Sequence, residues 1–255
     1  MARIISFFNQ KGGVGKTTSA INLSAAVANK RKKVLVIDVD PQGNLTSGYG
    51  ADATSGTLYH VLSGKKDAKD VIVSTSHKNV DIIPGSTDTA GLEIEFAISG
   101  DWQYKLREVC LELAPDYDYI FLDLPPSLGI LSIMALNASG GIISTIQSEY
   151  YALEGLSHLL KTVDLVRENY NSGIEIAGVL ITMYDSRNNL SREVVNEVKS
   201  FFKDVMFENV IPRSIKLAEA PGYGLSILDY DENSQGAKAY LALAKEFLDR
   251  EKRRN

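Results

Sequence analysis

The 255-residue sequence predicts an α/β fold in which helices cover both faces of a mostly parallel sheet. Short β-branched runs alternate with longer helical patterns, which is typical of parallel strands joined by crossover helices. The run Lys33–Asp38 is almost wholly apolar, as expected for a strand covered on both faces. We therefore expect one three-layer domain over residues 1–255, with a twisted sheet of about seven or eight strands flanked by helices.

The first three elements form one βαβ unit. Ile4–Asn9 is the first strand, Thr17–Asn29 is a helix that opens at a glycine-rich stretch, and Lys33–Asp38 is the second strand. Weak patterning over Asp52–Ser76 indicates short helices. Further strands are expected at Val80–Pro84, Tyr119–Asp123, Gly141–Ile146, Ile176–Thr182 and Phe207–Ile211. Further helices are expected near Asp101–Leu113, Ala152–Tyr170, Ser191–Phe202 and Ser234–Arg250.

Composition limits the kinds of protein that the chain can be. Hydrophobic residues make up 44% of it, enough for a sizeable core, and no internal repeat or linker divides it. The single cysteine, Cys110, rules out an internal disulfide and a Cys-rich metal site. The first strand follows the N-terminus without an apolar signal region, and no 18-residue apolar run occurs, so we expect a cytoplasmic protein.

The net charge of −5 argues against a protein that coats nucleic acid with its whole surface. Residues 187–255 hold 12 Lys or Arg against 11 Asp or Glu, whereas the preceding residues hold 15 against 21. A basic patch, if the chain has one, is therefore expected in the C-terminal quarter.

The stretch Asn-Gln-Lys-Gly-Gly-Val-Gly-Lys-Thr-Thr at 9–18 predicts a phosphate site. The usual phosphate loop has glycine five positions before its Gly-Lys pair, but here that position is Gln10. Glycines after a strand and before a helix still allow backbone N–H groups to surround phosphate oxygens, and the helix N-terminus adds positive charge. The predicted nucleotide-binding residues are Lys11, Gly12, Gly13, Val14, Gly15, Lys16, Thr17 and Thr18.

Within this loop Lys16 fills the role of neutralising the β- and γ-phosphates, and the Thr17 hydroxyl is placed to coordinate Mg²⁺. The spacing alone leaves the second lysine, Lys11, without a role. Aspartates end two apolar runs, at Ile-Asp-Val-Asp-Pro-Gln (37–42) and Phe-Leu-Asp-Leu-Pro-Pro (121–126). In a parallel sheet these strand ends lie beside the ligand.

Asp123 is placed to hold Mg²⁺ through water. Asp38 and Asp40 are two residues apart and share a face if the strand continues, so that one organises metal and the other water. For any one of them alone, a turn-forming or helix-capping role is the alternative.

These residues together resemble the ParA/Soj partition ATPases, within the deviant Walker A (MinD/ParA) branch of P-loop NTPases. The resemblance covers nearly the whole chain. Five motifs in the family's order carry it: the loop at 9–18, Ile-Asp-Val-Asp-Pro-Gln-Gly-Asn at 37–44, Asp-Leu-Pro-Pro-Ser-Leu-Gly at 123–129, Glu-Tyr-Tyr-Ala-Leu-Glu-Gly-Leu at 149–156, and Glu-Ala-Pro at 219–221.

The resemblance implies a slow ATPase with ATP and Mg²⁺ as cofactors. By it Lys11 is the signature lysine, which reaches the phosphates of ATP in a partner subunit and so implies an ATP-sandwich homodimer. Lys11, Lys16 and Asp40 are then catalytic, with Asp40 positioning the attacking water. Thr17 and Asp123 serve the metal. Pro212 and Ser214, with Arg213 between them, fall on the family's adenine-side loop.

The resemblance also implies binding of nonspecific DNA, through Arg187 and Lys216, and a ParB-type partner that stimulates hydrolysis and releases the dimer. No N-terminal helix-turn-helix extension is expected, so the DNA contact should be sequence-independent and the protein nucleoid-associated. Lys216 and Gln235 stand where arginine is common in the family. Gly140 and Thr145 stand where an acidic residue and proline are usual in the family, and loss of the acid removes a cap or an interface contact there.

Two other functions fit parts of the pattern. A MinD-like ATPase would need an amphipathic C-terminal helix for the membrane, but Phe247-Leu248 are followed by Asp-Arg-Glu-Lys-Arg-Arg-Asn, so no membrane contact is expected. An inactive scaffold that binds DNA or a partner would not need the intact loop and aspartates. The cargo, whether chromosome, plasmid or protein cluster, is left open by the sequence.

Overall fold

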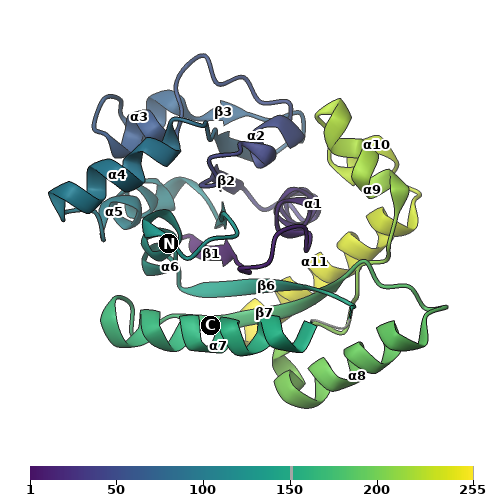
Figure 1. Cartoon of the computed structure of the whole chain (residues 1–255). Coiled ribbons are helices and arrows are strands. Elements are labelled where there is room, and N and C mark those ends of the chain that lie inside the picture. Colours follow the sequence, from purple (N-terminus) through teal and green to yellow (C-terminus); the bar gives the residue numbers. More distant parts are fainter. Residues whose placement is uncertain (150–151, 255) are drawn as a thin grey trace.

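The computed structural model describes residues 1–149 and 152–254, with the side chains of 152–156 outside that description. Figure 1 shows a twisted sheet at the centre, with helices on both sides. The strand order is β3-β4-β2-β5-β1-β6-β7, and within the described residues only the β3–β4 pair is antiparallel. The strands are β1 Arg3–Phe7, β2 Val34–Asp38, β3 Val73–Ser74, β4 Val80–Ile83, β5 Tyr119–Asp123, β6 Gly141–Gln147 and β7 Glu175–Thr182. The predicted α/β class and mostly parallel sheet are confirmed.

Two hydrophobic layers cover the sheet. Side chains alternate along each strand, so that Ile5 and Phe7 of β1 pack with α1 and α11, whereas Ile4 and Phe8 pack on the opposite face with α4 to α7. The helices are α1 Lys16–Ala28, α2 Asn44–Gly48, α3 Leu58–Leu62, α4 Thr89–Ser99, α5 Lys105–Leu113, α6 Ile130–Ala138, α7 Ala152–Asn169, α8 Asn189–Phe202, α9 Ile215–Glu219, α10 Ile227–Tyr230 and α11 Gln235–Arg254. The 3₁₀ turns are η1 Ala68–Val71, η2 Ala114–Asp116, η3 Lys203–Val205 and η4 Ala220–Tyr223.

Three neighbouring strands end at the same level. In the parallel register, Asp123 at the end of β5 lies opposite Phe7 at the end of β1 and opposite Asp38 at the end of β2. The glycine loop follows β1, and the segment with Asp40 follows β2. The sheet therefore brings the three phosphate-site motifs, which are far apart in sequence, to one edge.

The prediction of a strand at Phe207–Ile211 is wrong. The segment runs beside β7 and donates backbone hydrogen bonds to it from Phe207 and Ile211, but forms only isolated bridges at its two ends. Between them the backbone N–H groups of Glu208 and Asn209 both donate to the carboxylate of Glu246 on α11. This side chain draws the middle of the segment away from the strand edge.

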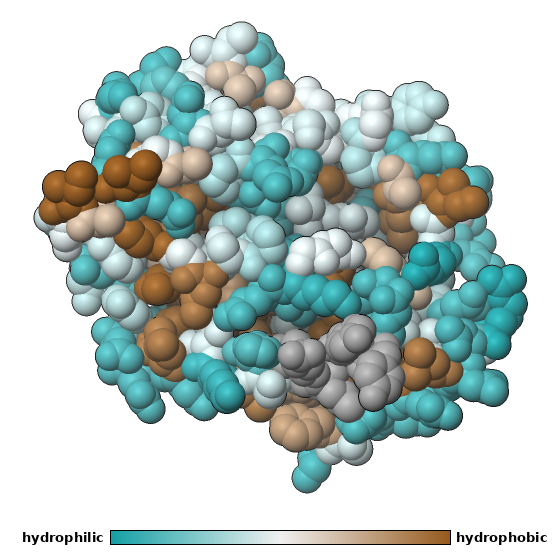
Figure 2. Space-filling view, in the orientation of Figure 1, coloured by the Kyte–Doolittle hydropathy of each residue, from teal (hydrophilic) through white to brown (hydrophobic). Residues whose placement is uncertain are grey.

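Helices α2, α4, α6, α9 and α10 and the short strand β3 were not predicted, and the two longest of these helices are α4 and α6. Both helices are rich in apolar residues, and α6 buries most of its surface, so neither shows the polar stripe by which a surface helix is recognised. In Figure 2 most of the visible surface is hydrophilic, but hydrophobic atoms gather over α4, where Ile94 and Ile98 are exposed. Among the described residues no helix is long and apolar enough to cross a membrane.

Candidate active site

The glycine loop is open toward solvent on one side and is anchored to the end of β7 on the other. Gly13 and Gly15 adopt φ of +74° and +84°, and a Cβ at Gly12 or Gly13 would meet nothing within 4 Å. The carbonyl of Val14 accepts a hydrogen bond of 2.9 Å from the Thr182 hydroxyl at the end of β7. These conformations are ones that glycine adopts without strain, and they leave the loop open at the N-terminus of α1, as a phosphate-binding loop requires.

The base of the loop is fixed by Asn9. Its side-chain oxygen accepts from the backbone N–H of Lys11 at 2.9 Å, and its side-chain nitrogen donates to the carbonyl of Thr145 at 2.8 Å. The Lys11 side chain is exposed on the outer side of the loop. Lys11 is thus held by its backbone while its side chain points to the surface.

A cavity of about 450 Å³ lies in front of the loop. It collects most of the predicted nucleotide residues, with others from α2 and the segment before it: Gly12, Gly13, Gly15, Lys16, Thr17, Thr18, Asp40, Gln42, Asn44 and Pro126. The Lys16 ammonium lies 3.4 Å from the carbonyl of Lys11. Burial lowers the pKa of Lys16, while the charges of Asp123 and Asp40 oppose that shift.

The structure separates the roles of Asp38 and Asp40. Asp38 ends β2, so the strand does not continue to Asp40 as the shared-face prediction required. The Asp38 carboxylate accepts from the N–H and the hydroxyl of Thr46, at 2.8 and 2.7 Å, and burial raises its pKa to about 6. Asp40 lines the cavity instead. Asp38 therefore fastens α2 to the sheet, and Asp40 faces the ligand.

Asp123 is buried at the end of β5, close to Thr17 and Lys16 of the phosphate loop. Its side chain is fully buried, and neither carboxylate oxygen accepts a hydrogen bond within the described part of the chain. Burial first, and then the charge of Asp38, raise its pKa well above the ordinary value, while the nearby Thr17 hydroxyl and Lys16 ammonium lower it. Two unpartnered buried oxygens beside a threonine hydroxyl fit Mg²⁺, which takes few protein ligands and several water or phosphate oxygens. The described residues contain no group of three or more His, Cys, Asp or Glu side chains placed to hold a metal.

A second, apolar cavity of about 190 Å³ adjoins the first and shares Gly15, Thr18 and Met183 with it. Pro212 and Ser214 line it, where the adenine-side loop was predicted. Sequence reasoning missed Met183, which has φ of +52° and lines both cavities. The only sequence signal for Met183 was its position directly after an apolar strand. A small apolar pocket beside a phosphate cradle suits a nucleotide base.

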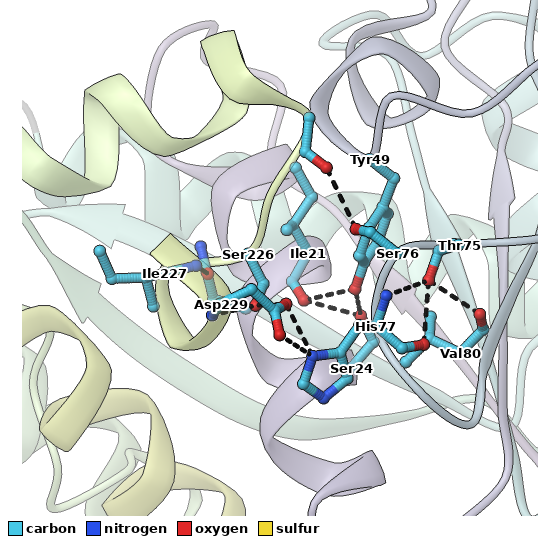
Figure 3. Close-up of polar contacts among 12 residues, drawn as sticks. Ile21, Ser24, Tyr49, Thr75, Ser76, His77, Val80, Ser226, Ile227 and Asp229 are labelled. Atoms are coloured by element: carbon cyan, nitrogen blue, oxygen red, sulfur yellow. Dashed lines mark hydrogen bonds and ion pairs between the residues drawn. The ribbon is translucent and has the colours of Figure 1, made fainter. Parts of the chain in front are cut away.

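The segment that carries the base pocket is pinned at its far end, as Figure 3 shows. His77, in the β3–β4 turn, lies 2.7 Å from the Asp229 carboxylate, and the Ser76 hydroxyl donates to the carbonyl of Gly224 at 3.2 Å. The backbone N–H of Ile227 donates to the Asn22 side chain of α1 at 2.7 Å. The segment from 212 to 231 is thus tied both to the sheet edge and to the helix of the phosphate loop.

Arg187 and Lys216, the predicted DNA-binding residues, lie outside both cavities. The Arg187 side chain is 89% exposed and makes two hydrogen bonds, of 2.9 and 2.8 Å, to the Asp185 carboxylate, which lower the pKa of Asp185 to about 2. The Lys216 ammonium is paired with Asp231. Both side chains lie on the surface, and each is paired with a carboxylate of the same chain. Of the motif at 149–156, residues 150–151 and the side chains of 152–156 lie outside the described residues.

A larger cavity, of about 810 Å³, lies at the opposite end of the sheet. Its cations are already paired, because Arg3 contacts Glu175 and Glu251, and Arg254 contacts the same two carboxylates. The Arg3 guanidinium also occupies the space beside Gly140, where a Cβ would lie 2.8 Å from it. Arg3 is therefore paired with Glu175 and Glu251 without an acidic side chain at position 140.

A parallel sheet with a glycine cradle, a buried lysine and two strand-end aspartates defines a P-loop nucleotide hydrolase. Comparison with known proteins identifies the branch. A family model described as an AAA domain matches residues 2–176. The sporulation initiation inhibitor protein Soj of Bacillus subtilis is 47% identical over 96% of this chain and 98% of its own length. The chain belongs to the Soj/ParA family of chromosome-partitioning ATPases, as predicted.

Solved structures of other proteins share this fold. Cobyrinic acid a,c-diamide synthase of Mycobacterium smegmatis, crystallised with ADP and magnesium, has a TM-score of 0.87 at 31% identity and covers 100% of this chain and 97% of its own. The cell division ATPase MinD of Pyrococcus furiosus has a TM-score of 0.81 at 30% identity, with 98% and 99% covered. ADP and magnesium in the first of these are consistent with the predicted cofactors.

Proposed function

We propose that this chain is a partition ATPase that binds ATP and Mg²⁺, forms an ATP-sandwich dimer, binds nonspecific DNA as that dimer, and leaves DNA after hydrolysis stimulated by a ParB-type protein. One observation carries the proposal: a complete phosphate site stands beside a second lysine, Lys11, whose side chain is exposed outside it. Lys16 already serves the local phosphates. An exposed lysine on the same loop is placed for the phosphates of another subunit.

Several residues in and beside the two cavities have a role in this reaction. Lys16 and the loop N–H groups would hold the phosphate oxygens, and Thr17 and Asp123 would hold Mg²⁺, whose bound charge offsets that of the phosphates. Asp40, on the cavity wall, would orient the attacking water. Pro212, Ser214 and Met183 would enclose the base. Because phosphoryl transfer depends on positioning and charge, the monomer should be slow and the partner's lysine should matter.

Arg187 and Lys216 support DNA binding less directly than the cavity residues support ATP binding. Arg187 and Lys216 are both exposed, but each already has a carboxylate partner, so a monomer should bind DNA weakly. The shared fold alone does not favour a MinD-like membrane function. The last turn of α11 is basic, and its Arg254 contacts Glu175 on β7 at 2.6 Å, so this turn packs on the protein. We accordingly place the protein on the nucleoid.

The test is the oligomeric state of Lys11→Ala. Wild-type protein should change from monomer to dimer in light scattering with ATP and Mg²⁺, but not with ADP, and should shift random-sequence DNA in low salt only as the dimer. Lys11→Ala should bind ATP and remain a monomer. Lys65→Ala, which removes an exposed lysine remote from the loop, is the matched control. A dimer of equal strength for Lys11→Ala would refute the sandwich.

A further inference from the structure

Gln10 stands where the usual phosphate loop has glycine, and its side chain reaches a distant helix. The side-chain nitrogen of Gln10 donates a hydrogen bond of 3.0 Å to the hydroxyl of Thr162 on α7, 152 positions further along the chain. Gln10 does not have a positive φ, so the backbone at this position does not require glycine. This hydrogen bond, the Gln10–Thr162 tether, therefore joins the loop to α7 one residue before Lys11.

Thr162 is a buried polar residue on an apolar side of α7. It is 3% exposed, and its neighbours on that side are the buried residues Leu159, Val163 and Val166. The Thr162 hydroxyl donates to the carbonyl of His158, one turn earlier, at 2.9 Å. Because a hydroxyl has one hydrogen to donate, its oxygen lone pairs remain for the Gln10 amide. The tether thus satisfies a polar group that would be costly to bury without a partner.

The backbone of Lys11 is held at several points. Its N–H donates to the side-chain oxygen of Asn9 at 2.9 Å, and its carbonyl lies 3.4 Å from the Lys16 ammonium. Asn9 is itself fixed by its hydrogen bond to the carbonyl of Thr145. Gln10 adds an attachment to α7. Since a lysine side chain is long and flexible, the position of its backbone decides which directions its ammonium can reach.

The phosphate-binding part of the loop has other attachments. Val14 is anchored by the Thr182 hydroxyl, and Lys16 begins α1, which is buried against the sheet. Neither attachment involves Gln10 or α7. Loss of the tether should therefore disturb the position of Lys11 more than it disturbs the residues that hold phosphate.

We propose that Gln10, through its hydrogen bond to Thr162, positions Lys11 for the phosphates of ATP in a second subunit. The inference rests on the proposed function, in which Lys11 contacts ATP across the dimer. Gln10 is a positioning residue in this arrangement, because it acts through the backbone of Lys11. The glutamine that replaces glycine fixes the loop at the point where the second lysine leaves it.

The test removes the tether from each of its two sides. Gln10→Met keeps the length of the side chain and removes its amide, and Thr162→Val keeps the volume and removes the hydroxyl. Sedimentation velocity with saturating ATP and Mg²⁺ should give a dimer dissociation constant raised at least about tenfold in each variant, because a symmetric dimer contains the tether twice. The ATP affinity of the monomer, measured by titration at low protein concentration, should remain that of the wild type.

Three further variants separate the tether from other causes. Thr162→Ser keeps the hydroxyl and should dimerise as the wild type does. Gln103→Met makes the change of Gln10→Met at a half-buried glutamine between α4 and α5, and is the matched control. Thr162 is buried and cannot touch a second subunit, so its effect on the dimer passes through Gln10 or through α7. If it passes through Gln10, Gln10→Met/Thr162→Val should be no weaker than either single variant.

Several outcomes would overturn the positioning role. Dimerisation of Thr162→Val at wild-type strength, or additive losses in the double variant, would refute the tether. A loss of ATP affinity in Gln10→Met as large as its loss of dimerisation would show that Gln10 supports the phosphate-binding part of the loop instead of Lys11. A wild type that stays monomeric with ATP and Mg²⁺ refutes the proposed function, whereas a wild type and a Gln10→Met variant that dimerise equally refute only the role of Gln10.

Discussion

The charges of the phosphate site and those of the C-terminal surface are arranged in opposite ways. Asp38 and Asp123 are buried at strand ends and Lys16 is buried at the start of α1, and all three have displaced pKa values. Arg187 and Lys216 are exposed, and each rests on a neighbouring carboxylate. Buried charges are fixed by the fold and costly to leave unmatched, whereas exposed ion pairs contribute about 0–1 kcal/mol and exchange partners readily. The first arrangement suits chemistry and the second suits reversible contact with a polyanion.

The largest effect is expected at Asp40. Asp40→Ala should slow ATP hydrolysis by roughly 100-fold or more, the range for removing a group that handles the attacking water, while leaving ATP-dependent dimerisation intact. Phosphate release in single turnover, with light scattering alongside, measures both. Asp52→Ala removes an exposed aspartate outside the cavity and should behave as wild type. Hydrolysis at the wild-type rate by Asp40→Ala would remove Asp40 from the reaction.

A smaller effect is expected behind the glycine loop, at Thr182. Thr182→Val removes the hydroxyl that donates to the Val14 carbonyl and leaves a buried acceptor unpaired, at a cost of about 1–3 kcal/mol. Much of that cost should appear as weaker nucleotide binding, roughly tenfold, because the loop loses its anchor. Isothermal titration with ATP and Mg²⁺ measures it. Thr182→Ser keeps the hydroxyl and should retain most of the affinity, so equal loss in both variants would argue against the hydrogen bond.

The phosphate site was largely predictable because its residues are local in sequence and their chemistry is specific. A glycine-rich turn before a helix and aspartates at the ends of apolar strands predict where their side chains lie in the fold. Contacts between distant segments were not predictable. Thr182 is 168 positions from Val14, and Met183 reaches the base pocket only because β7 ends beside the loop. The strand expected at Phe207–Ile211 failed for the same reason, since Glu246 acts on it from α11.

The role of the exposed ion pairs is tested by removing the carboxylate charge that pairs with Arg187. Asp185→Asn should raise the affinity of the ATP-bound protein for random-sequence DNA by a few-fold, because Arg187 no longer has to exchange a carboxylate for a phosphate. Glu193→Gln makes the same charge change at an exposed position on α8 and is the matched control. Fluorescence anisotropy at several salt concentrations measures both. If the two variants gain equally, net charge and not the pairing with Arg187 explains the change.

The smallest effect concerns the tie between His77 and Asp229, which lies between the two regions. Burial raises the pKa of Asp229, but hydrogen bonds from His77 and Ser226 outweigh it, and the net pKa is lowered. A carboxyl whose pKa is lower in the folded state stabilises the fold above its unfolded pKa of about 3.9 and loses that contribution as the pH falls through the folded value. Asp229→Asn should therefore lower the free energy of unfolding by about 1 kcal/mol at pH 7, and the difference from wild type should shrink below pH 4. Urea titrations at both pH values measure it, with Glu232→Gln as a control on an exposed neighbour. A difference that stays constant with pH would show that the carboxylate charge contributes nothing to holding this segment.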